Sequence, residues 1–400
     1  MTAGQRVVVV GASLAGVNAV HGLRAAGFAG RVSVVGAEPH VPYDRPPLSK
    51  QSLLGTEPRA LDVHDDAEWL LGRRAMSVDL ASRVVELDGG AGLGFDGLVI
   101  ATGAEAVRPP WRDVVALRTL DDCRALRAAL DGGAGHVVVV GAGFVGAEVA
   151  ASCRAQGVAV TVADELDLPL ARSCGPLVGE VLAALHREHG ARLELGVKVA
   201  AVHEGGRAGR HEVELADGRV LAADVVVAGL GARPATGWLS GSGLALDDGV
   251  LCDETLLAAP GVVAAGDVCR RPSRAFGTSL RVEHWTNAVE QGEYAGRRLH
   301  AALSGGPAPE PFDAVPYLWT EQYGHTVQMF GCPEPGDEIH VVHGDPAARR
   351  FAAVHVRGGV VRAVTGMDCP ARVRRLRPLV AGAQRWTTSA TGTETTCWNR

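Results

Sequence analysis

The sequence predicts an α/β fold in which buried parallel strands alternate with helices, and two observations carry this prediction. Residues 7–10 and residues 137–140 are runs of four valines, the pattern of a strand that is buried on both faces. Each run leads directly into a glycine-rich turn and then into a helix. Because the same strand, turn and helix occur twice, we expect two domains of similar architecture.

The two glycine-rich turns match the fingerprint of a dinucleotide-binding site. Residues 11–16 read GASLAG, and residues 141–146 read GAGFVG. Glycines let the backbone turn sharply and approach a pyrophosphate, whose charge then lies against free N–H groups at the helix N-terminus. In the first copy Ser13 replaces the central glycine, which would place the backbone a little further from the phosphate. Two such turns predict two bound dinucleotides.

An acidic residue is expected at the end of the strand that follows each helix, where its carboxylate can hold a ribose diol. Glu38 ends the first such strand, residues 31–38, and Asp164 ends the second, residues 158–164. A lone glycine-rich turn is a weak signal, because such turns also occur for packing reasons alone. Here each copy has its strand, its helix and its acid.

Three further strands complete the predicted sheets. Residues 95–103 and 224–234 have the pattern of closing strands of the two nucleotide domains. Residues 262–268 form a third strand of this kind, which places Asp267 at its carboxyl end. There the carboxylate can accept a hydrogen bond from a ribityl hydroxyl, and the alternative is that Asp267 caps a helix.

Composition indicates a soluble, cytoplasmic enzyme. The 400 residues are enough for two to three domains, and the net charge of −6 argues against a nucleic-acid surface over the whole chain. We expect no signal peptide and no membrane-spanning helix, because the first valine run leads straight into Gly11. The eight cysteines have no C-x-x-C spacing, so we expect neither a disulfide scaffold nor a metal site. Cys269 and Cys369 deserve notice only for their positions.

Taken together, the motifs resemble the FAD-dependent pyridine-nucleotide oxidoreductases, and specifically the ferredoxin reductases that serve oxygenases. The segments that carry the resemblance are residues 42–50 (PYDRPPLSK), 141–148, 266–268 (GDV), 283–285 (EHW), 288–292 (AVEQG) and 315–324 (VPYLWTEQYG). The resemblance implies a glutathione-reductase-like fold of two Rossmann-like dinucleotide-binding domains and a C-terminal α+β domain. The implied FAD-binding domain is split over residues 1–110 and 240–315. The NAD-binding domain spans residues 111–239, and the C-terminal interface domain spans residues 316–400, with a polar tail from about residue 386.

The resemblance also implies roles for individual residues. The implied FAD contacts are Ala15, Glu38, Arg45, Lys50, Met76, Arg118, Asp267 and Trp285. The wider cofactor-binding set adds Gly11, Ser13, Gly16, Ala101, Thr102, Gly103, Gly141, Gly143, Phe144, Val145, Gly146, Asp164, Gly231 and Glu283. Trp319 would lie beside the flavin ring and the partner surface.

Lys50 and Glu148 are the other two predicted catalytic residues. Lys50 is one of only two lysines in a chain with 39 basic residues. We expect a compact ammonium group there to stabilise the reduced flavin in a geometry that a bulkier guanidinium does not reach. The resemblance implies that Glu148 lies near the nicotinamide and pairs with this lysine. The alternative for Glu148 is a solvated carboxylate on a helix.

The flavin is expected to be the sole redox centre, because the chain has no cysteine pair in the positions that the dithiol members of the family use. A flavin can take a hydride from a nicotinamide and release single electrons. The implied partner is an acidic [2Fe–2S] ferredoxin that serves a cytochrome P450 or Rieske-type oxygenase, and the implied protein is a monomer or a weak dimer. NADH is favoured over NADPH, because Asp164 and Glu165 would repel a 2′-phosphate, with Arg172 as the one nearby basic group.

Positive charge is concentrated toward the C-terminus. Residues 349–400 contain ten arginines against Asp368 and Glu394. Arg372, Arg374, Arg375 and Arg377 could steer an acidic ferredoxin toward the protein, and the alternative is a solvated helix face.

Three other functions stay open at this point. The protein could be a flavoprotein that reduces a small molecule directly, or an NADH-responsive interaction protein similar to the apoptosis-inducing factor branch. It could also be a protein that has lost its flavin. The sequence leaves the electron acceptor, the terminal oxygenase, the oligomeric state and any redox role of Cys269 or Cys369 undecided.

Overall fold

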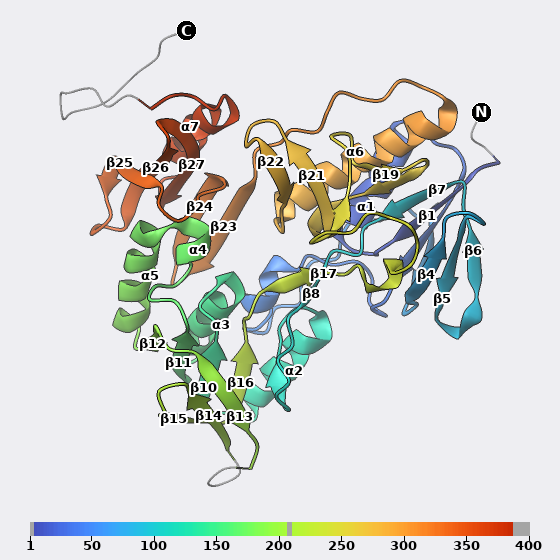
Figure 1. The fold of residues 1–400 in the computed structure, drawn as a ribbon. Coiled ribbons are helices and arrows are strands. Elements are labelled where there is room, and N and C mark those ends of the chain that lie inside the picture. Colours follow the sequence, from blue (N-terminus) through green and yellow to red (C-terminus); the bar gives the residue numbers. More distant parts are fainter. Residues whose placement is uncertain (1–3, 206–209, 387–400) are drawn as a thin grey trace. The chain divides into compact units, whose positions relative to one another are not determined.

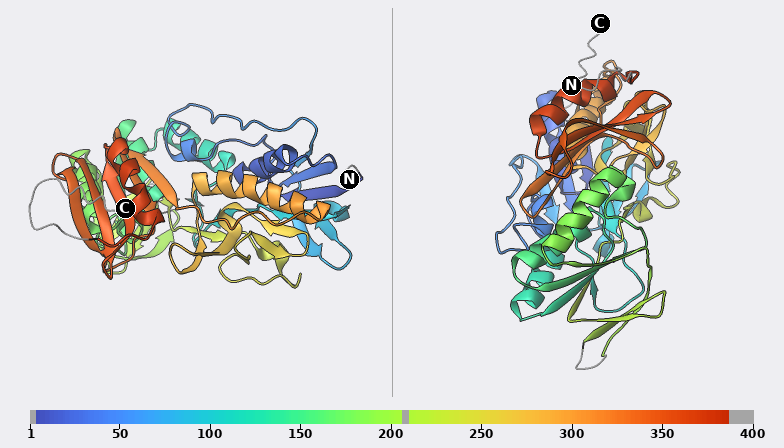
Figure 2. Two further views of the ribbon diagram at one scale, coloured as in Figure 1. Left: turned by 90° about the horizontal axis from the view of Figure 1, so that it is seen from above. Right: turned by 90° about the vertical axis from the view of Figure 1, so that its left-hand side faces the viewer.

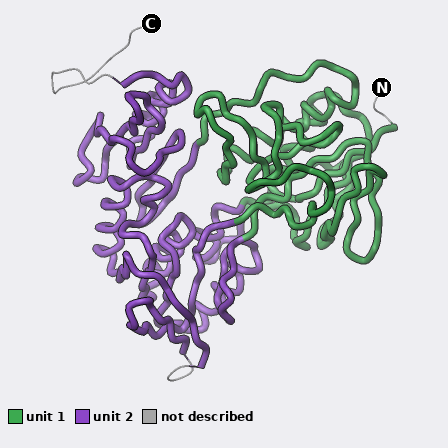
Figure 3. The backbone as a smooth tube through the Cα atoms, in the orientation of Figure 1, with its two compact units in different colours: residues 1–44, 59–105, 233–316 green, residues 45–58, 106–232, 317–400 purple. Residues whose placement is uncertain are grey.

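The computed structural model describes residues 4–205 and 210–386, and the chain divides into two compact units (Figure 3). Unit 1 contains residues 1–44, 59–105 and 233–316. Unit 2 contains residues 45–58, 106–232 and 317–400. Each unit is therefore assembled from three separate stretches of the sequence. The domain boundaries given above remain a prediction.

Unit 1 is built on a six-stranded sheet with the strand order β19-β20-β7-β1-β2-β3. Neighbouring strands run parallel, except that β19 and β20 run antiparallel. The valine run of β1 is at most 3% exposed, as its apolar pattern requires. The strands are β1 (Arg6–Val10), β2 (Arg31–Gly36), β3 (Glu68–Leu71), β7 (Gly97–Ile100), β19 (Leu257–Ala259) and β20 (Val262–Ala264).

Two helices of unit 1, α1 (Leu14–Ala25) and α6 (Trp285–Ser304), pack side by side (Figure 2). Glycines allow their backbones to come close. A Cβ atom on Gly22 would lie 2.1 Å from the carbonyl oxygen of Glu293, and one on Gly296 would lie 2.3 Å from that of Ala19. This contact fixes the direction in which both helices point their N-termini.

Smaller sheets complete unit 1. One is the antiparallel sheet of β4 (Ala75–Asp79), β5 (Val84–Leu87) and β6 (Gly92–Gly94), and another joins β18 (Val250–Leu251), β21 (Cys269–Ser273) and β22 (Thr278–Arg281). Short 3₁₀ turns lie at η2 (Asp88–Gly90), η4 (Gly237–Leu239) and η5 (Gly266–Val268). The chain passes between the units in β8 (Ala104–Ala106) and β17 (Ala232–Pro234).

Unit 2 repeats the parallel architecture with the order β12-β11-β10-β16-β9 (Figure 1). Its strands are β9 (Val114–Val115), β10 (His136–Val140), β11 (Ala159–Asp164), β12 (Arg192–Leu195) and β16 (Val225–Ala228). Its helices are α2 (Leu120–Asp131), α3 (Phe144–Ala155), α4 (Ala171–Cys174) and α5 (Pro176–Glu188), and η1 (Pro46–Ser49) is a 3₁₀ turn. Between β12 and β16 the chain forms a separate antiparallel sheet. Its strands are β13 (Val199–His203), β14 (His211–Leu215) and β15 (Val220–Ala223).

The C-terminal part of unit 2 is an antiparallel five-stranded sheet in the order β23-β24-β27-β26-β25, followed by α7 (Pro370–Ala381). Leu182 and Leu185 of α5 share a hydrophobic core with Leu318, Phe351 and Met367 of this sheet. The strands are β23 (Tyr317–Gln322), β24 (His325–Gly331), β25 (Glu338–Asp345), β26 (Arg350–Arg357) and β27 (Val360–Met367).

The predicted fold class is confirmed: two parallel-sheet nucleotide folds and a C-terminal α+β part are present. Details differ at strand ends. The strand that was expected to end at Glu38 ends at Gly36, and the strand expected over 262–268 ends at Ala264. Asp267 does not cap a helix, because it lies inside η5, where Ala265 occupies the capping position. The predicted tail lies outside the described residues from residue 387 onward, and Cys397 lies there too.

No helix within residues 4–205 and 210–386 is long and apolar enough to cross a membrane.

Candidate functional site

The first glycine of each turn is required by close backbone contacts, and the two copies match. Gly11 has φ = +122°, and a Cβ atom there would lie 2.1 Å from the carbonyl oxygen of Ala101. Gly141 has φ = +103°, and a Cβ atom would lie 2.4 Å from the carbonyl oxygen of Gly229. Each turn therefore passes directly over the end of a neighbouring strand, β7 or β16, as dinucleotide folds do.

The third glycine of each turn is required by packing between helix and turn. A Cβ atom on Gly16 would lie 1.9 Å from the carbonyl oxygen of Gly11, and one on Gly146 would lie 2.0 Å from that of Gly141. The central position is different, because the nearest atom to a Cβ atom on Gly143 is 3.9 Å away. The protein's own packing therefore gives no reason for glycine at 143, whereas a ligand that approaches the backbone does.

Both turns open a helix whose first N–H groups point out of the turn. Ser13 and Gly143 occupy the capping positions of α1 and α3, and neither makes a side-chain capping hydrogen bond. The first N–H groups of a helix have no partner within the helix. Two 12-residue helices that begin uncapped at the carboxyl ends of parallel sheets fit the pyrophosphate groups of two dinucleotides.

Hydrogen bonds from nearby residues hold both acidic residues that are predicted to bind ribose. Asp164 accepts hydrogen bonds from the backbone N–H groups of Ala142 (2.6 Å) and Leu166 (2.7 Å), which hold its carboxylate against the second turn. Glu38 accepts a hydrogen bond of 2.6 Å from the hydroxyl group of Tyr43. Such contacts orient a carboxylate and leave lone pairs for ribose hydroxyls.

The proline-rich segment of residues 45–58 belongs to unit 2 because helices α2 and α3 hold it. Cys123 Sγ donates to the carbonyl oxygen of Leu48 (3.3 Å), and Ser152 Oγ donates to that of Ser49 (2.7 Å). The Arg45 guanidinium donates to the carbonyl oxygen of Arg118 (2.8 Å). The predicted FAD contacts in unit 2 are thus held by one framework. They are Arg45, Lys50 and Arg118.

Lys50 and Glu148 form a buried ion pair within unit 2. Lys50 Nζ lies 2.9 Å from Glu148 Oε2, and the side chains are 12% and 6% exposed. Ser49 Oγ donates to the same carboxylate oxygen (2.6 Å), and Thr320 Oγ1 donates to Oε1 (2.7 Å). Glu148 is therefore not the solvated helix carboxylate that the sequence left open. The roles of the pair in catalysis remain a prediction.

The Lys50 ammonium group retains a donor for a ligand. Its second hydrogen bond goes to the carbonyl oxygen of Pro46 (3.0 Å). Among the described residues the structure shows no acceptor for the third N–H, although only 12% of the side chain is exposed. A buried ammonium group with two of its three N–H groups bonded within the protein fits a cofactor that carries carbonyl or ring-nitrogen acceptors, as a flavin does.

The remaining predicted cofactor residues are divided between the two units. In unit 1, Trp285 Nε1 donates to Asp44 (2.7 Å), Thr102 Oγ1 donates to the carbonyl oxygen of Ala235 (2.9 Å), and Met76 on β4 is 54% exposed. Glu283 is ion-paired with Arg281. In unit 2, Trp319 on β23 is half-buried and stacks on Tyr317 with ring centres 6.0 Å apart.

His284 is a further polar group of interest beside Asp267. It precedes the 20-residue helix α6, and its Nδ1 atom is buried with no hydrogen-bond partner within the described chain. Burial lowers the pKa of His284 to about 4, and the nearby Asp267 carboxylate opposes this shift. A buried nitrogen without a partner is costly, so this atom fits an additional group bound near Asp267.

Two features of the structure were not predicted from the sequence. Ser49 and Thr320 lie in segments that carried the resemblance, but nothing in the sequence indicated that both donate to Glu148. Cys252 and Cys269 are 17 residues apart in the sequence, and their Sγ atoms are 3.8 Å apart because β18 and β21 are neighbours. The contact with Cys269 and burial raise the pKa of Cys252, and burial raises the pKa of Cys369, which favours the protonated form of both thiols.

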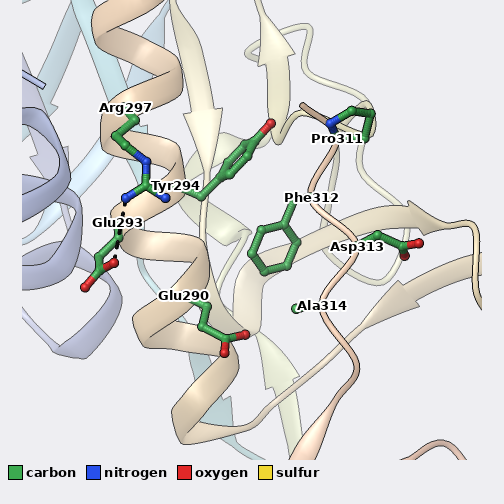
Figure 4. Close-up of a pocket in the computed structure, with 8 residues that line it drawn as sticks. All are labelled: Glu290, Glu293, Tyr294, Arg297, Pro311, Phe312, Asp313 and Ala314. Atoms are coloured by element: carbon green, nitrogen blue, oxygen red, sulfur yellow. Dashed lines mark ion pairs between the residues drawn. The ribbon is translucent and has the colours of Figure 1, made fainter. Parts of the chain in front are cut away.

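Neither of two cavities in the described part of unit 1 is lined by the predicted catalytic residues. One of about 270 Å³ lies between α6 and residues 311–314, where Tyr294 and Phe312 face each other and Glu293 pairs with Arg297 (Figure 4). The other, of about 240 Å³, is lined by Trp285, Asp44 and residues of α1.

The burial of two histidines predicts that the protein loses stability in mild acid. His186 and His355 are each 1% exposed, and burial lowers the pKa of each to about 4. The unfolded chain takes up a proton near pH 6.5, whereas the folded protein does not until about pH 4, so the free energy of unfolding falls as the pH falls through this window. The shift corresponds to about 3 kcal/mol for each histidine.

Melting temperatures measured between pH 7 and pH 4.5 test this expectation. The variant His355→Phe is expected to lose less melting temperature over this range than the wild type. Parallel curves for the two proteins would show that His355 does not contribute.

Comparison with known proteins decides the family. The model of the pyridine nucleotide-disulphide oxidoreductase family matches residues 5–292, and the model of a reductase C-terminal domain matches residues 317–396. The chain belongs to the pyridine nucleotide-disulphide oxidoreductase family. As a member of this family it is a flavoprotein oxidoreductase, which confirms the resemblance read from the motifs.

Relatives of this oxidoreductase are similar over nearly their whole length. The biphenyl dioxygenase system ferredoxin–NAD(+) reductase component of Paraburkholderia xenovorans is 37% identical over 376 residues, which is 90% of each chain. Putidaredoxin reductase of Pseudomonas putida is 31% identical and covers 95% of this chain and 92% of the relative.

Solved structures agree with these sequence matches. In the crystal structure of the covalent putidaredoxin reductase–putidaredoxin complex, the matching chain has a TM-score of 0.87 at 30% identity and covers 95% of this chain and 94% of that chain. The ferredoxin reductase for the CYP199A2 system of Rhodopseudomonas palustris has a TM-score of 0.88 at 32% identity, with 96% of each chain covered.

Proposed function

We propose that this oxidoreductase is an NADH-dependent ferredoxin reductase, which transfers a hydride from NADH to FAD and then passes single electrons to a [2Fe–2S] ferredoxin of an oxygenase system. The observation that carries this proposal is the buried ion pair between Lys50 and Glu148. Glu148 lies on α3, the helix that begins at the second dinucleotide turn. The full-length similarity to ferredoxin reductase components supports the assignment of the acceptor.

The residues of unit 2 would divide the work between binding and positioning. The N–H groups at the start of α3 hold the pyrophosphate of NADH, and Asp164 holds its adenosine ribose. Lys50 donates to the flavin, while Glu148 and the carbonyl oxygen of Pro46 fix the ammonium group. When bound, FAD supplies the ability to accept a hydride and to release electrons one at a time. Hydride transfer by proximity and stacking needs no general base.

The preference for NADH follows from the charges around Asp164. The carboxylate lies against the turn through Ala142, and a 2′-phosphate at the ribose would bring two further negative charges toward it. Arg172, which the sequence places near this site, pairs with Glu165 at 3.4 Å on the surface. These contacts favour a ribose diol over a phosphate.

A direct experiment compares the rate of flavin reduction by NADH and by NADPH in stopped flow. We expect NADH to be preferred by about tenfold or more in rate divided by dissociation constant. Equal values for the two nucleotides would overturn the assignment of Asp164, and a purified protein without bound flavin would overturn the proposed function altogether.

Helix α7 offers a basic surface for an acidic ferredoxin. Arg372, Arg374, Arg375 and Arg377 are exposed, while Val373 and Val380 face the sheet. The guanidinium of Arg377 lies over the ring of Phe330 at 5.6 Å, which holds it at the surface. Exposed charges of one sign raise the rate of encounter with a partner of opposite charge.

Charge reversal on α7 tests this surface. Arg374→Glu and Arg375→Glu are expected to slow electron delivery to ferredoxin by about tenfold at low salt, and much less at high salt, because salt screens exposed charges. Arg187→Glu, an exposed reversal on α5, is the matched control. An effect that does not change with salt would argue for local unfolding instead of steering.

A further inference from the structure

Strand β23 turns polar side chains toward the interior of unit 2. Side chains alternate along a strand, and Leu318, Thr320 and Gln322 share the inward face, where Thr320 is 1% and Gln322 is 2% exposed. A hydroxyl and an amide in such a position need hydrogen-bond partners. Their partners connect the strand to Glu148.

The hydrogen bonds run in one direction, toward the Glu148 carboxylate. Gln322 Nε2 donates to Thr320 Oγ1 (3.2 Å), and Thr320 Oγ1 donates to Glu148 Oε1 (2.7 Å). The other end of the amide, Gln322 Oε1, must therefore accept, and its partner is His186 Nε2 (3.0 Å). We refer to His186, Gln322 and Thr320 as the Glu148 network.

The protonation state of the network is also determined. Because His186 Nε2 carries the proton and burial keeps the ring neutral, Nδ1 accepts from the Tyr323 hydroxyl group (2.9 Å). Burial raises the pKa of Tyr323, so this hydroxyl remains a donor at neutral pH. Each link thus has one possible direction.

The conformation of the turn after β23 places Tyr323 at this position. Tyr323 and Gly324 have φ = +52° and +81°, the pattern of a two-residue hairpin turn. Tyrosine is disfavoured at positive φ, but its ring is held by stacking on His189 at 4.1 Å and by its bond to His186. A disfavoured backbone conformation that the surroundings enforce marks a position with a specific task.

We propose that the Glu148 network is a positioning device that fixes the orientation of the Glu148 carboxylate and, through it, of the Lys50 ammonium group. Thr320 holds Oε1, while Ser49 and Lys50 share Oε2, so rotation of the carboxylate would break all three contacts. The value of this device for catalysis depends on the proposed function, in which Lys50 faces the flavin. The geometric part of the proposal stands independently of it.

The scarcity of lysine makes the geometry measurable. Lys50 and Lys198 are the only lysines in the chain, and Lys198 is exposed. Acetylation of the holoprotein with acetic anhydride, followed by mass spectrometry, gives the rate at Lys50 with Lys198 as an internal control. In Thr320→Val we expect the Lys50 to Lys198 rate ratio to rise about fivefold, the factor for one lost intramolecular hydrogen bond. Thr320→Ser keeps the hydroxyl group and is expected to restore the wild-type ratio.

Gln322→Leu provides a second variant, because it leaves Thr320 in place and removes the amide that donates to Thr320 and accepts from His186. We expect a smaller rise in the same ratio. Unchanged ratios in both Thr320→Val and Gln322→Leu would overturn the proposal, and so would a rise in Thr320→Ser equal to that in Thr320→Val, since packing would then explain it.

Flavin reduction by NADH separates this proposal from the proposed function. In Thr320→Val the limiting rate is expected to fall while the dissociation constant for NADH stays unchanged, with recovery in Thr320→Ser. If the acetylation ratio rises but the reduction rate does not change, the network positions the pair and the role of the pair in reduction is wrong. If Lys50→Met slows reduction but Thr320→Val changes neither readout, only the network is overturned.

Discussion

Replacing Lys50 with methionine is expected to slow flavin reduction by NADH about tenfold to hundredfold while FAD remains bound. Glu148→Gln is expected to give an effect of similar size, because the neutral amide keeps the volume but no longer fixes the ammonium group. The measurement is stopped-flow reduction of the flavin under anaerobic conditions. The exposed carboxylate of Glu321, changed in Glu321→Gln, provides the matched control.

The same two variants are also expected to lower the melting temperature. Each single change leaves a buried charge without its partner, which costs about 3 kcal/mol or more, whereas the double change removes both charges. We therefore expect the double variant Lys50→Met with Glu148→Gln to melt higher than either single variant. Wild-type reduction kinetics in both single variants would discard the catalytic role of the pair, and additive losses in melting temperature would argue against the ion pair.

Two glycines of the second turn are expected to respond in opposite ways to alanine. Gly146→Ala places a Cβ atom 2.0 Å from the carbonyl oxygen of Gly141, so the turn and helix α3 must separate and the protein is expected to lose several kcal/mol of stability or fail to fold. In Gly143→Ala the nearest protein atom is 3.9 Å away. The melting temperature should therefore stay unchanged, while the dissociation constant for NADH rises by about tenfold or more because the methyl group occupies space that the pyrophosphate needs.

Titration of NADH against the oxidised protein, together with a thermal melt of the free protein, checks both variants. Unchanged NADH binding in Gly143→Ala would mean that the second turn does not hold a pyrophosphate. The first turn provides a comparison, because Ser13 stands at the corresponding position and NADH binding should not respond to Ser13→Ala.

The sequence was sufficient to predict the repeated parallel architecture because local chemistry determines it. Four consecutive valines have no polar residue for solvent, so β1 and β10 lie within their sheets, and Gly11 and Gly141 allow the sharp turns that follow. The ends of strands were less predictable. Glu38 lies two residues beyond β2, because strand length depends on pairing with neighbouring strands, which no local pattern encodes.

The candidate site was predictable only in part for the same reason. Lys50 and Glu148 were predicted to pair because the motifs around them resembled a known family. The donors Thr320 and Ser49 come from distant segments, and their contact with Glu148 depends on how β23 and residues 45–58 pack on α3. Similarly, the 3.8 Å approach of Cys252 and Cys269 results from the pairing of β18 and β21.

An anaerobic single turnover shows whether the flavin passes electrons to a ferredoxin. The purified protein is reduced with one equivalent of NADH and mixed with an oxidised [2Fe–2S] ferredoxin, and reoxidation of the flavin is followed by its absorbance. We expect fast reoxidation in one-electron steps, at a rate that saturates with ferredoxin concentration. Slow reoxidation with several ferredoxins, although NADH reduces the flavin rapidly, would contradict this expectation.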